Sequence, residues 1–158
     1  MGETMNTYHF VLVLADANPD IESLEDRLFE AGCDDALVCY YNQTVYLEFD
    51  READTAIEAM TSAIENVNAA GFRVRSIQEG GYASMAELAA MSGLSRQAIN
   101  NFAKGTRGPG NFPKPVYGVS SGTPLYEWPE VAHWLVDQNK IDPSVFEIAQ
   151  AAKELRVH

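Results

Sequence analysis

The chain has 158 residues and a formal net charge of −12 at pH 7, from 23 acidic and 11 basic side chains. This length suits one ordinary domain or two small ones, and a hydrophobic content of 46% is enough for a buried core. No apolar run approaches the roughly 20 residues of a membrane-spanning helix, and the N-terminal stretch lacks the basic region of a signal peptide. We therefore expect a cytoplasmic protein with no membrane partner.

The cysteines and histidines indicate neither a disulfide framework nor a metal centre. Cys33 and Cys39 form no CxxC pair. We expect both thiols to be reduced and buried, because free cysteine is among the most buried residue types. The three histidines are far apart in the sequence, and none has a second ligand at metal-binding spacing. No metal or cofactor is implied.

Charge is distributed unevenly along the chain. Residues 1–79 contain 16 acidic and 4 basic residues, whereas residues 80–158 contain seven of each. Gly80-Gly81 lies at this change and is suited to a hinge. The sequence predicts two domains, 1–79 and 80–158, with different partners.

The first domain begins with an apolar, β-branched run over 8–15, which predicts a central strand. Apolar residues at helical spacing predict a helix over 21–31, and Gly32 is suited to end it. Two further strands, 36–41 and 44–50, flank a two-residue tight turn. The second of these strands alternates between an apolar face and a wet, acidic one.

Four acidic residues follow one another at every second position from the polar face of that strand onward: Glu48, Asp50, Glu52 and Asp54. Such carboxylates can hold Ca²⁺ or Mg²⁺ when a loop folds them inward. The glycine and the closing glutamate of an EF-hand are missing, and a predicted change to helix near Ala53 breaks the alternation. A solvated acidic edge is therefore the preferred interpretation.

A second helix is predicted over 53–70, followed by a last strand over 72–77. The expected inner stripe of this helix is Ala56, Ile57, Met60, Ile64 and Val67. The order β-α-β-β-α-β resembles the ferredoxin-like sandwich, an antiparallel sheet with both helices on one face. RNA-binding domains share this topology, but the charge of −12 would repel phosphate. The sequence does not distinguish between ligand binding, partner binding and dimerisation as the function of this first domain.

The second domain carries a more specific signal. Ser84 and Glu87 fit a capping box that starts a helix at Met85. Gly93 is suited to a tight turn, and Ser95 caps a second helix over 96–104 that Gly105 ends. This arrangement is a helix-turn-helix.

The second of these helices has an apolar side and a polar side. Leu94, Ile99 and Phe102 are predicted to dock it on the first helix. The opposite side, with Asn101 at its margin, carries Arg96, Gln97, Asn100 and Lys104. Arginine can form forked hydrogen bonds to guanine, and asparagine or glutamine can do the same to adenine. No acidic residue occurs from 88 to 126, which suits a surface that meets a polyanion.

A glycine-rich loop over 105–110 then carries Arg107, and Lys114 follows between two prolines. Segments 116–119 and 124–128 are predicted to form a hairpin with a polar tip. A helix starts at Trp128, with Val131, Trp134 and Leu135 as its inner stripe. A last helix is predicted from Pro143 to about Val157, behind Asp142 as its cap. Its apolar stripe can close the domain's own core, the preferred use, or pair with a second copy.

Three pieces in order, ELAAMSGLSRQAINNF, PKP and LYEWPEVAHWL, make residues 85–137 resemble the winged helix-turn-helix of the MerR and excisionase (AlpA-like) families. The resemblance implies a second helix in the major groove and a hairpin wing against the flanking backbone or minor groove. It implies these groove residues: Ser95, Arg96, Gln97, Asn100 and Lys104. It also places Arg107, Lys114 and the wing tip 120–123 near phosphates. The chain departs from the family in its GTRGPGNF insertion and in a wing without lysine or arginine.

Together these features predict a sequence-specific DNA-binding transcriptional regulator, a prokaryotic repressor that acts as a dimer on double-stranded DNA. One alternative is an antitoxin-like interaction protein whose acidic domain binds a basic protein. Another is a repressor that senses a small ligand. A further interpretation treats the helix-turn-helix as a compact fold with a merely solvated polar face. No enzyme is expected, because the sequence has no nucleophile elbow, phosphate-cradling loop or metal signature.

Overall fold

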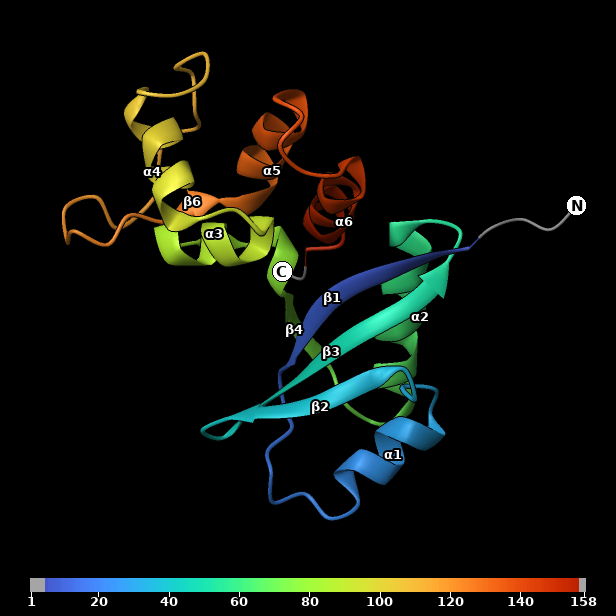
Figure 1. Ribbon diagram of the computed structural model, residues 1–158. Coiled ribbons are helices and arrows are strands. Elements are labelled where there is room, and N and C mark those ends of the chain that lie inside the picture. Colours follow the sequence, from blue (N-terminus) through green and yellow to red (C-terminus); the bar gives the residue numbers. More distant parts are fainter. Residues whose placement is uncertain (1–4, 157–158) are drawn as a thin grey trace, which may run out of the picture. The chain divides into compact units, whose positions relative to one another are not determined.

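The structure is a computed structural model that describes residues 5–156, and it divides into two compact units. The first unit comprises the described residues up to Glu79 together with those from Glu154 onward, and the second comprises Gly80–Lys153. The expected mixed α+β class is confirmed: the described residues contain a four-stranded antiparallel sheet and six α-helices (Figure 1). The boundary between Glu79 and Gly80 coincides with the glycine pair at which the charge balance of the sequence changes.

The sheet of the first unit contains β1 (Asn6–Leu14), β2 (Ala36–Tyr41), β3 (Thr44–Ala53) and β4 (Val74–Ile77). The strand order is β2-β3-β1-β4, and every neighbouring pair is antiparallel. The two longest strands therefore lie in the centre, and β2 and β4 form the edges.

The predicted hairpin between β2 and β3 is confirmed. Tyr41 pairs with Thr44, and Asn42 in the intervening turn has a φ of 54°. Asparagine tolerates this left-handed conformation better than most residues do. Val45, Leu47 and Phe49 are fully buried, so the predicted apolar face of β3 is the face that meets the core.

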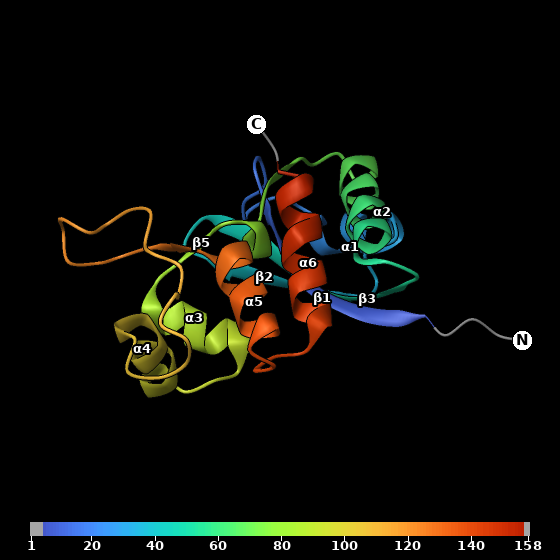
Figure 2. The ribbon, with the colours of Figure 1, turned by 90° about the horizontal axis from the view of Figure 1, so that it is seen from above.

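Helices α1 (Leu24–Glu30) and α2 (Ala56–Ala69) cover one and the same face of this sheet (Figures 1 and 2). Helix α2 begins three residues later than predicted, because β3 stays paired with β1 as far as Ala53. Thr55 then caps the helix by accepting a hydrogen bond from the backbone N–H of Glu58 at 3.2 Å. The prediction that Ala53 starts the helix was wrong.

The buried stripe of α2 is also rotated from the predicted one. Ala59 and Ala63 are fully buried, whereas Ile57 and Ile64 are only half-buried. The buried stripe therefore centres on small alanine side chains, and the larger isoleucines lie at its margins.

The two cysteines differ in their surroundings. Cys33 is buried, and this burial raises the pKa of its thiol to about 11. Cys39 is only half-buried, so the prediction that both thiols are buried was wrong for Cys39. Cys39 pairs with Tyr46 on the sheet face whose side chains alternate with the buried ones, and its Sγ lies 3.3 Å from Oε2 of Glu48.

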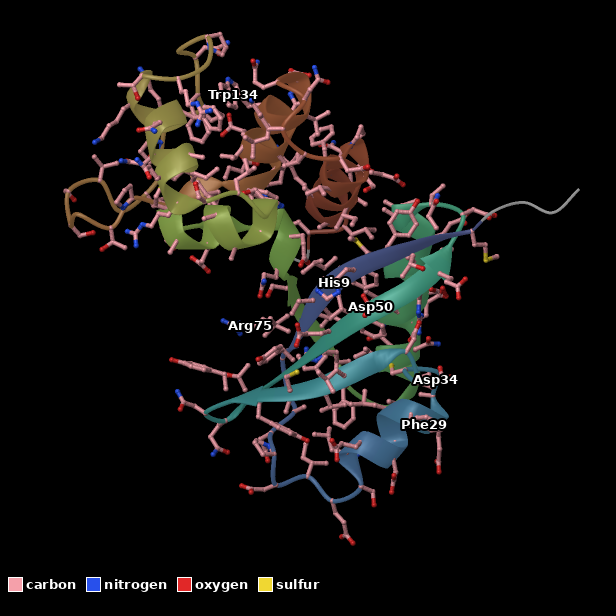
Figure 3. All side chains as sticks on the ribbon, in the orientation of Figure 1. His9, Phe29, Asp34, Asp50, Arg75 and Trp134 are labelled. Carbon is pink, nitrogen blue, oxygen red and sulfur yellow. The ribbon has the colours of Figure 1, made fainter. Side chains whose placement is uncertain are left out.

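Some carboxylates of the acidic edge predicted on β3 contact side chains of neighbouring residues in the sheet. Asp50 Oδ1 lies 2.8 Å from Nδ1 of His9 on β1, and Figure 3 shows these two exposed side chains next to each other. Among the described side chains, no group of three or more histidine, cysteine or acidic residues is arranged to hold a metal ion. Glu48 and Asp50 interact with neighbouring strand residues, and Glu52 and Asp54 are exposed to solvent.

One acidic side chain of the first unit is buried. Glu79 is 9% exposed, and its Oε1 accepts a hydrogen bond from the backbone N–H of Val11 at 3.0 Å. Burial raises the pKa of this carboxyl from 4.5 to about 7, although the hydrogen bond from Val11 lowers it. His9 also lowers this pKa, and Glu48 raises it.

We expect Glu79 to make the protein less stable as the pH rises from about 4.5 to about 7. Within this window the folded state keeps a proton that the unfolded chain releases, so ionisation costs folding free energy. Glu79→Gln keeps an oxygen acceptor but cannot ionise. The free energy of unfolding should be measured by denaturation at pH 5 and at pH 8. Between these two pH values the parent should lose up to about 3 kcal/mol more than Glu79→Gln does. If the free energy of unfolding changed equally with pH in the two proteins, this role of Glu79 would be contradicted.

The second unit is built from short strands and four helices. Its strands β5 (Tyr82–Ala83) and β6 (Tyr126–Glu127) pair antiparallel. A 3-10 turn, Gln78–Gly80, precedes β5. The helices are α3 (Met85–Ser92), α4 (Arg96–Lys104), α5 (Trp128–Asp137) and α6 (Pro143–Glu154). The predicted end of the last helix near Val157 lies outside the described residues.

The core of the second unit joins all four helices. Val131, Trp134 and Leu135 of α5 are buried, as their spacing predicted. Ala149 of α6 belongs to the same buried cluster, and Val145 and Phe146 pack against it. The apolar stripe of α6 is therefore used for the unit's own core. None of the helices within residues 5–156 is both long and apolar enough to cross a membrane.

Candidate nucleic-acid interface

Local signals at their ends define helices α3 and α4 and the short turn between them. The capping box is complete, since Ser84 N–H donates to Glu87 Oε1 at 2.9 Å and Glu87 N–H donates to Ser84 Oγ at 3.3 Å. Gly93 ends α3 with a φ of 74°, a conformation that a residue with a Cβ rarely adopts. Ser95 then caps α4 by accepting the N–H of Ala98 at 3.1 Å. The hydroxyl of Ser95, a predicted groove residue, thus also starts the helix.

Helix α4 has the two faces that the sequence predicts. Ile99 and Phe102 are buried in the core of the unit, and Leu94 packs against that core. The opposite side chains of Arg96, Gln97 and Lys104 are exposed, whereas those of Asn100 and Asn101 are half-buried. The exposed groups at the start of α4 are therefore a guanidinium and an amide, which can both form hydrogen bonds to base edges.

A shallow hollow of about 400 Å³ lies beside these groups. It is lined by Met85 of α3 and by three predicted groove residues of α4: Arg96, Gln97 and Asn100. The other predicted residues of α4, Asn101 and Lys104, do not line it. Sequence reasoning missed Met85, because an apolar residue in the first turn of a helix is indistinguishable in a pattern from a core residue.

The glycine-rich insertion that follows α4 is anchored to α5. The indole N–H of Trp134 donates to Oδ1 of Asn111 at 2.8 Å. The ring centroid of Phe112 lies 5.1 Å from that of Trp134, and a Cβ on Gly108 would come within 3.2 Å of the same indole. Figure 3 shows Trp134 at this end of the unit. The loop that carries exposed Arg107 is thus packed on an aromatic side chain although it has no regular structure.

The segment predicted as the wing, residues 116–128, has fewer strand residues than expected. Only Tyr126–Glu127 of the second predicted segment forms a strand, and that strand pairs with β5 rather than with residues 116–119. A single bridge joins Tyr117 to Leu125. Gly118 has a φ of 75°, and a Cβ there would lie 1.9 Å from the carbonyl oxygen of Thr123. This turn interrupts regular pairing, so the predicted strands were wrong. In both views the wing projects from its unit (Figures 1 and 2).

The basic residues of this region are available to an anion. Arg96, Lys104, Arg107 and Lys114 are all exposed, and within the described part of the chain none of them pairs with a carboxylate. Arg51, Arg73 and Lys153 elsewhere do form such pairs. Among residues 5–156, the four cations of the acid-free segment therefore have no carboxylate counterion.

Comparison of the chain with protein-family models, with curated proteins and with solved structures finds no match.

Proposed function

We propose that this chain is a sequence-specific DNA-binding transcriptional regulator, a prokaryotic repressor that acts as a dimer. Its second unit is a winged helix-turn-helix in this proposal, and α4 enters the major groove. The proposal rests on one observation: the N-terminal part of α4 exposes Arg96 and Gln97 beside an open hollow. A guanidinium and an amide in this position match the donors and acceptors of base edges.

The charge distribution supports a nucleic acid as the partner. Residues 88–126 include four basic residues and no acidic one, in a chain with a net charge of −12. Because the described residues give these four cations no carboxylate partner, the cations can replace the counterions of DNA phosphates without breaking an ion pair seen in the structure. Arg107 and Lys114, on the loop after α4, are the proposed phosphate contacts.

The first unit has a different role in this proposal. Its strand order and its two helices on one face suit a ferredoxin-like sandwich. With 16 acidic and 4 basic residues in positions 1–79, it repels phosphate and takes no part in DNA binding. It provides instead the contact to a second copy, to a small ligand or to a basic protein.

Two copies are needed because one copy offers only four cations to the DNA backbone, which limits the salt-dependent part of its affinity. Selection of binding sites from a pool of random duplexes, with the full-length protein, tests both points. We expect enrichment of a defined sequence that contains two symmetric half-sites, since the symmetry of a dimer is mirrored in its site. A pool without enrichment would refute the proposed function, and a single asymmetric half-site would refute the dimer.

Two substitutions in α4 should have different effects on the selected duplex. Arg96→Ala should reduce discrimination at one base pair by about 5- to 150-fold, because forked arginine contacts specify guanine. Lys104→Ala should weaken binding to all sequences alike, as expected for a phosphate contact. Fluorescence anisotropy with the selected duplex and with single-base variants measures both effects.

Arg75→Ala provides the matched control, since Arg75 is an exposed arginine of the first unit (Figure 3). This variant should bind every duplex as the parent does. Parent-like binding by both α4 variants would show that another surface meets the DNA.

A further inference from the structure

Met85 contributes an apolar side chain to a surface that otherwise presents polar and basic groups. It is the first residue of α3, and it is half-buried because it packs against the core cluster of the second unit. It also lines the hollow beside Arg96, Gln97 and Asn100. The core contact holds the thioether in place, so an apolar wall lies next to two amides.

The major groove offers few groups that match an apolar wall. Among the unmodified bases only thymine carries an apolar group there, its C5-methyl. The adenine of the same base pair presents an N6 donor and an N7 acceptor, which pair with the amide of asparagine or glutamine. An A·T pair therefore combines an apolar group and an amide-matching edge, which are the two features that meet in the hollow.

We propose that the hollow between α3 and α4 reads one A·T base pair, with Met85 against the thymine methyl and an amide of Gln97 or Asn100 on the adenine edge. This assignment rests on the proposed DNA-binding function and names the base pair that the site recognises. The hollow, about 400 Å³ in volume, is comparable to cavities that accept small organic molecules, so a base edge can enter it. Arg96 on its wall binds a guanine in a neighbouring pair.

Deoxyuridine differs from thymidine only in the missing methyl group, so it isolates the contact to Met85. In the selected duplex, each thymine is replaced in turn by deoxyuridine, and the affinity of the full-length protein is measured by anisotropy. In each half-site, we expect a single thymine position at which the replacement weakens binding about fourfold. This factor is the contribution of one buried methyl-sized group. Met85→Ala should bind the thymine and the deoxyuridine duplexes equally well.

Two further variants separate this contact from a general effect on folding. Met85→Leu keeps an apolar side chain of similar volume and should keep the preference for thymine. Met91→Ala removes another methionine of α3 that packs against the same core but does not line the hollow, and it should also keep the preference. Both variants should give the circular dichroism spectrum of the parent.

The outcomes distinguish this assignment from the proposed function. If no thymine replacement weakens binding, or if Met85→Ala retains the preference for thymine, the assignment is overturned while DNA binding stands. If the random pool yields no enriched duplex, the assignment falls together with the proposed function.

Discussion

Replacing Trp134 with alanine should lower the free energy of unfolding of the second unit by about 3–5 kcal/mol. The side chain is 7% exposed, and its ring centroid lies 5.2 Å from that of Phe102 and 5.1 Å from that of Phe112. Its loss leaves a cavity between α4 and α5 and also frees the loop that carries Arg107. Urea denaturation followed by the fluorescence of the remaining tryptophan, Trp128, measures this change.

Asn111→Ala is the matched control for this effect. It removes the hydrogen bond to the indole N–H but leaves the aromatic packing in place, so we expect a cost of about 1 kcal/mol. Trp134→Ala should also weaken DNA binding more than Asn111→Ala does. Equal stability of Trp134→Ala and Asn111→Ala would contradict the role of aromatic packing in anchoring the glycine-rich loop.

Arg51→Met should destabilise the first unit by about 2–3 kcal/mol, because it removes four hydrogen bonds of a buried guanidinium and leaves the half-buried carboxylate of Asp35 without its partner. Arg51 is 8% exposed. Its Nε and Nη2 donate to the two carboxylate oxygens of Asp35 at 2.8 and 2.9 Å, and Nη2 also donates to the carbonyl of Gly32 at 2.8 Å. Nη1 donates to Oγ of Ser62 at 3.0 Å, so one side chain ties β3 to α2 and to the loop before β2.

The control for Arg51 is Arg73→Met. Arg73 pairs with Asp16 at 3.2 Å, but its side chain is 76% exposed, and exposed pairs of this kind contribute little to stability. Far-UV circular dichroism follows the unfolding of both units, whereas tryptophan fluorescence follows only the second unit, where both tryptophans lie. A transition that only circular dichroism detects therefore belongs to the first unit. A loss for Arg51→Met no larger than that for Arg73→Met would contradict a structural role of the buried pair.

Several elements were predictable because their signals act over a few residues. The capping box at Ser84, the left-handed Gly93 and the cap at Ser95 each use atoms within one helical turn or one bend. Asn42 marks its hairpin in the same way, and the alternation of β3 identifies its buried face without knowledge of its neighbours. These local rules placed α3 and α4 correctly, and Arg96, Gln97 and Lys104 are exposed as predicted, whereas Asn100 is half-buried.

Other features depend on partners that sequence spacing cannot supply. Helix α2 starts late because β3 pairs with β1 as far as Ala53. The face that α2 buries against the rest of its unit contains Ala59 and Ala63, and Ile57 and Ile64 lie at its margins. The hairpin predicted over 116–128 keeps one bridge, Tyr117 to Leu125, because Gly118 turns the chain and β6 pairs with β5. Each of these errors comes from a competing contact elsewhere in the chain.

The sequence by itself determined where α3, α4 and the turn between them lie, which side of α4 is buried and how unevenly charge is distributed between the two halves. Only the tertiary structure decided that Met85 shares a hollow with Arg96, Gln97 and Asn100, and that Trp134 holds Asn111 from 23 residues away. The physical reason is the range of the interactions. Caps and turns are satisfied by neighbouring backbone groups, whereas hollows and aromatic contacts exist only once distant segments pack against each other.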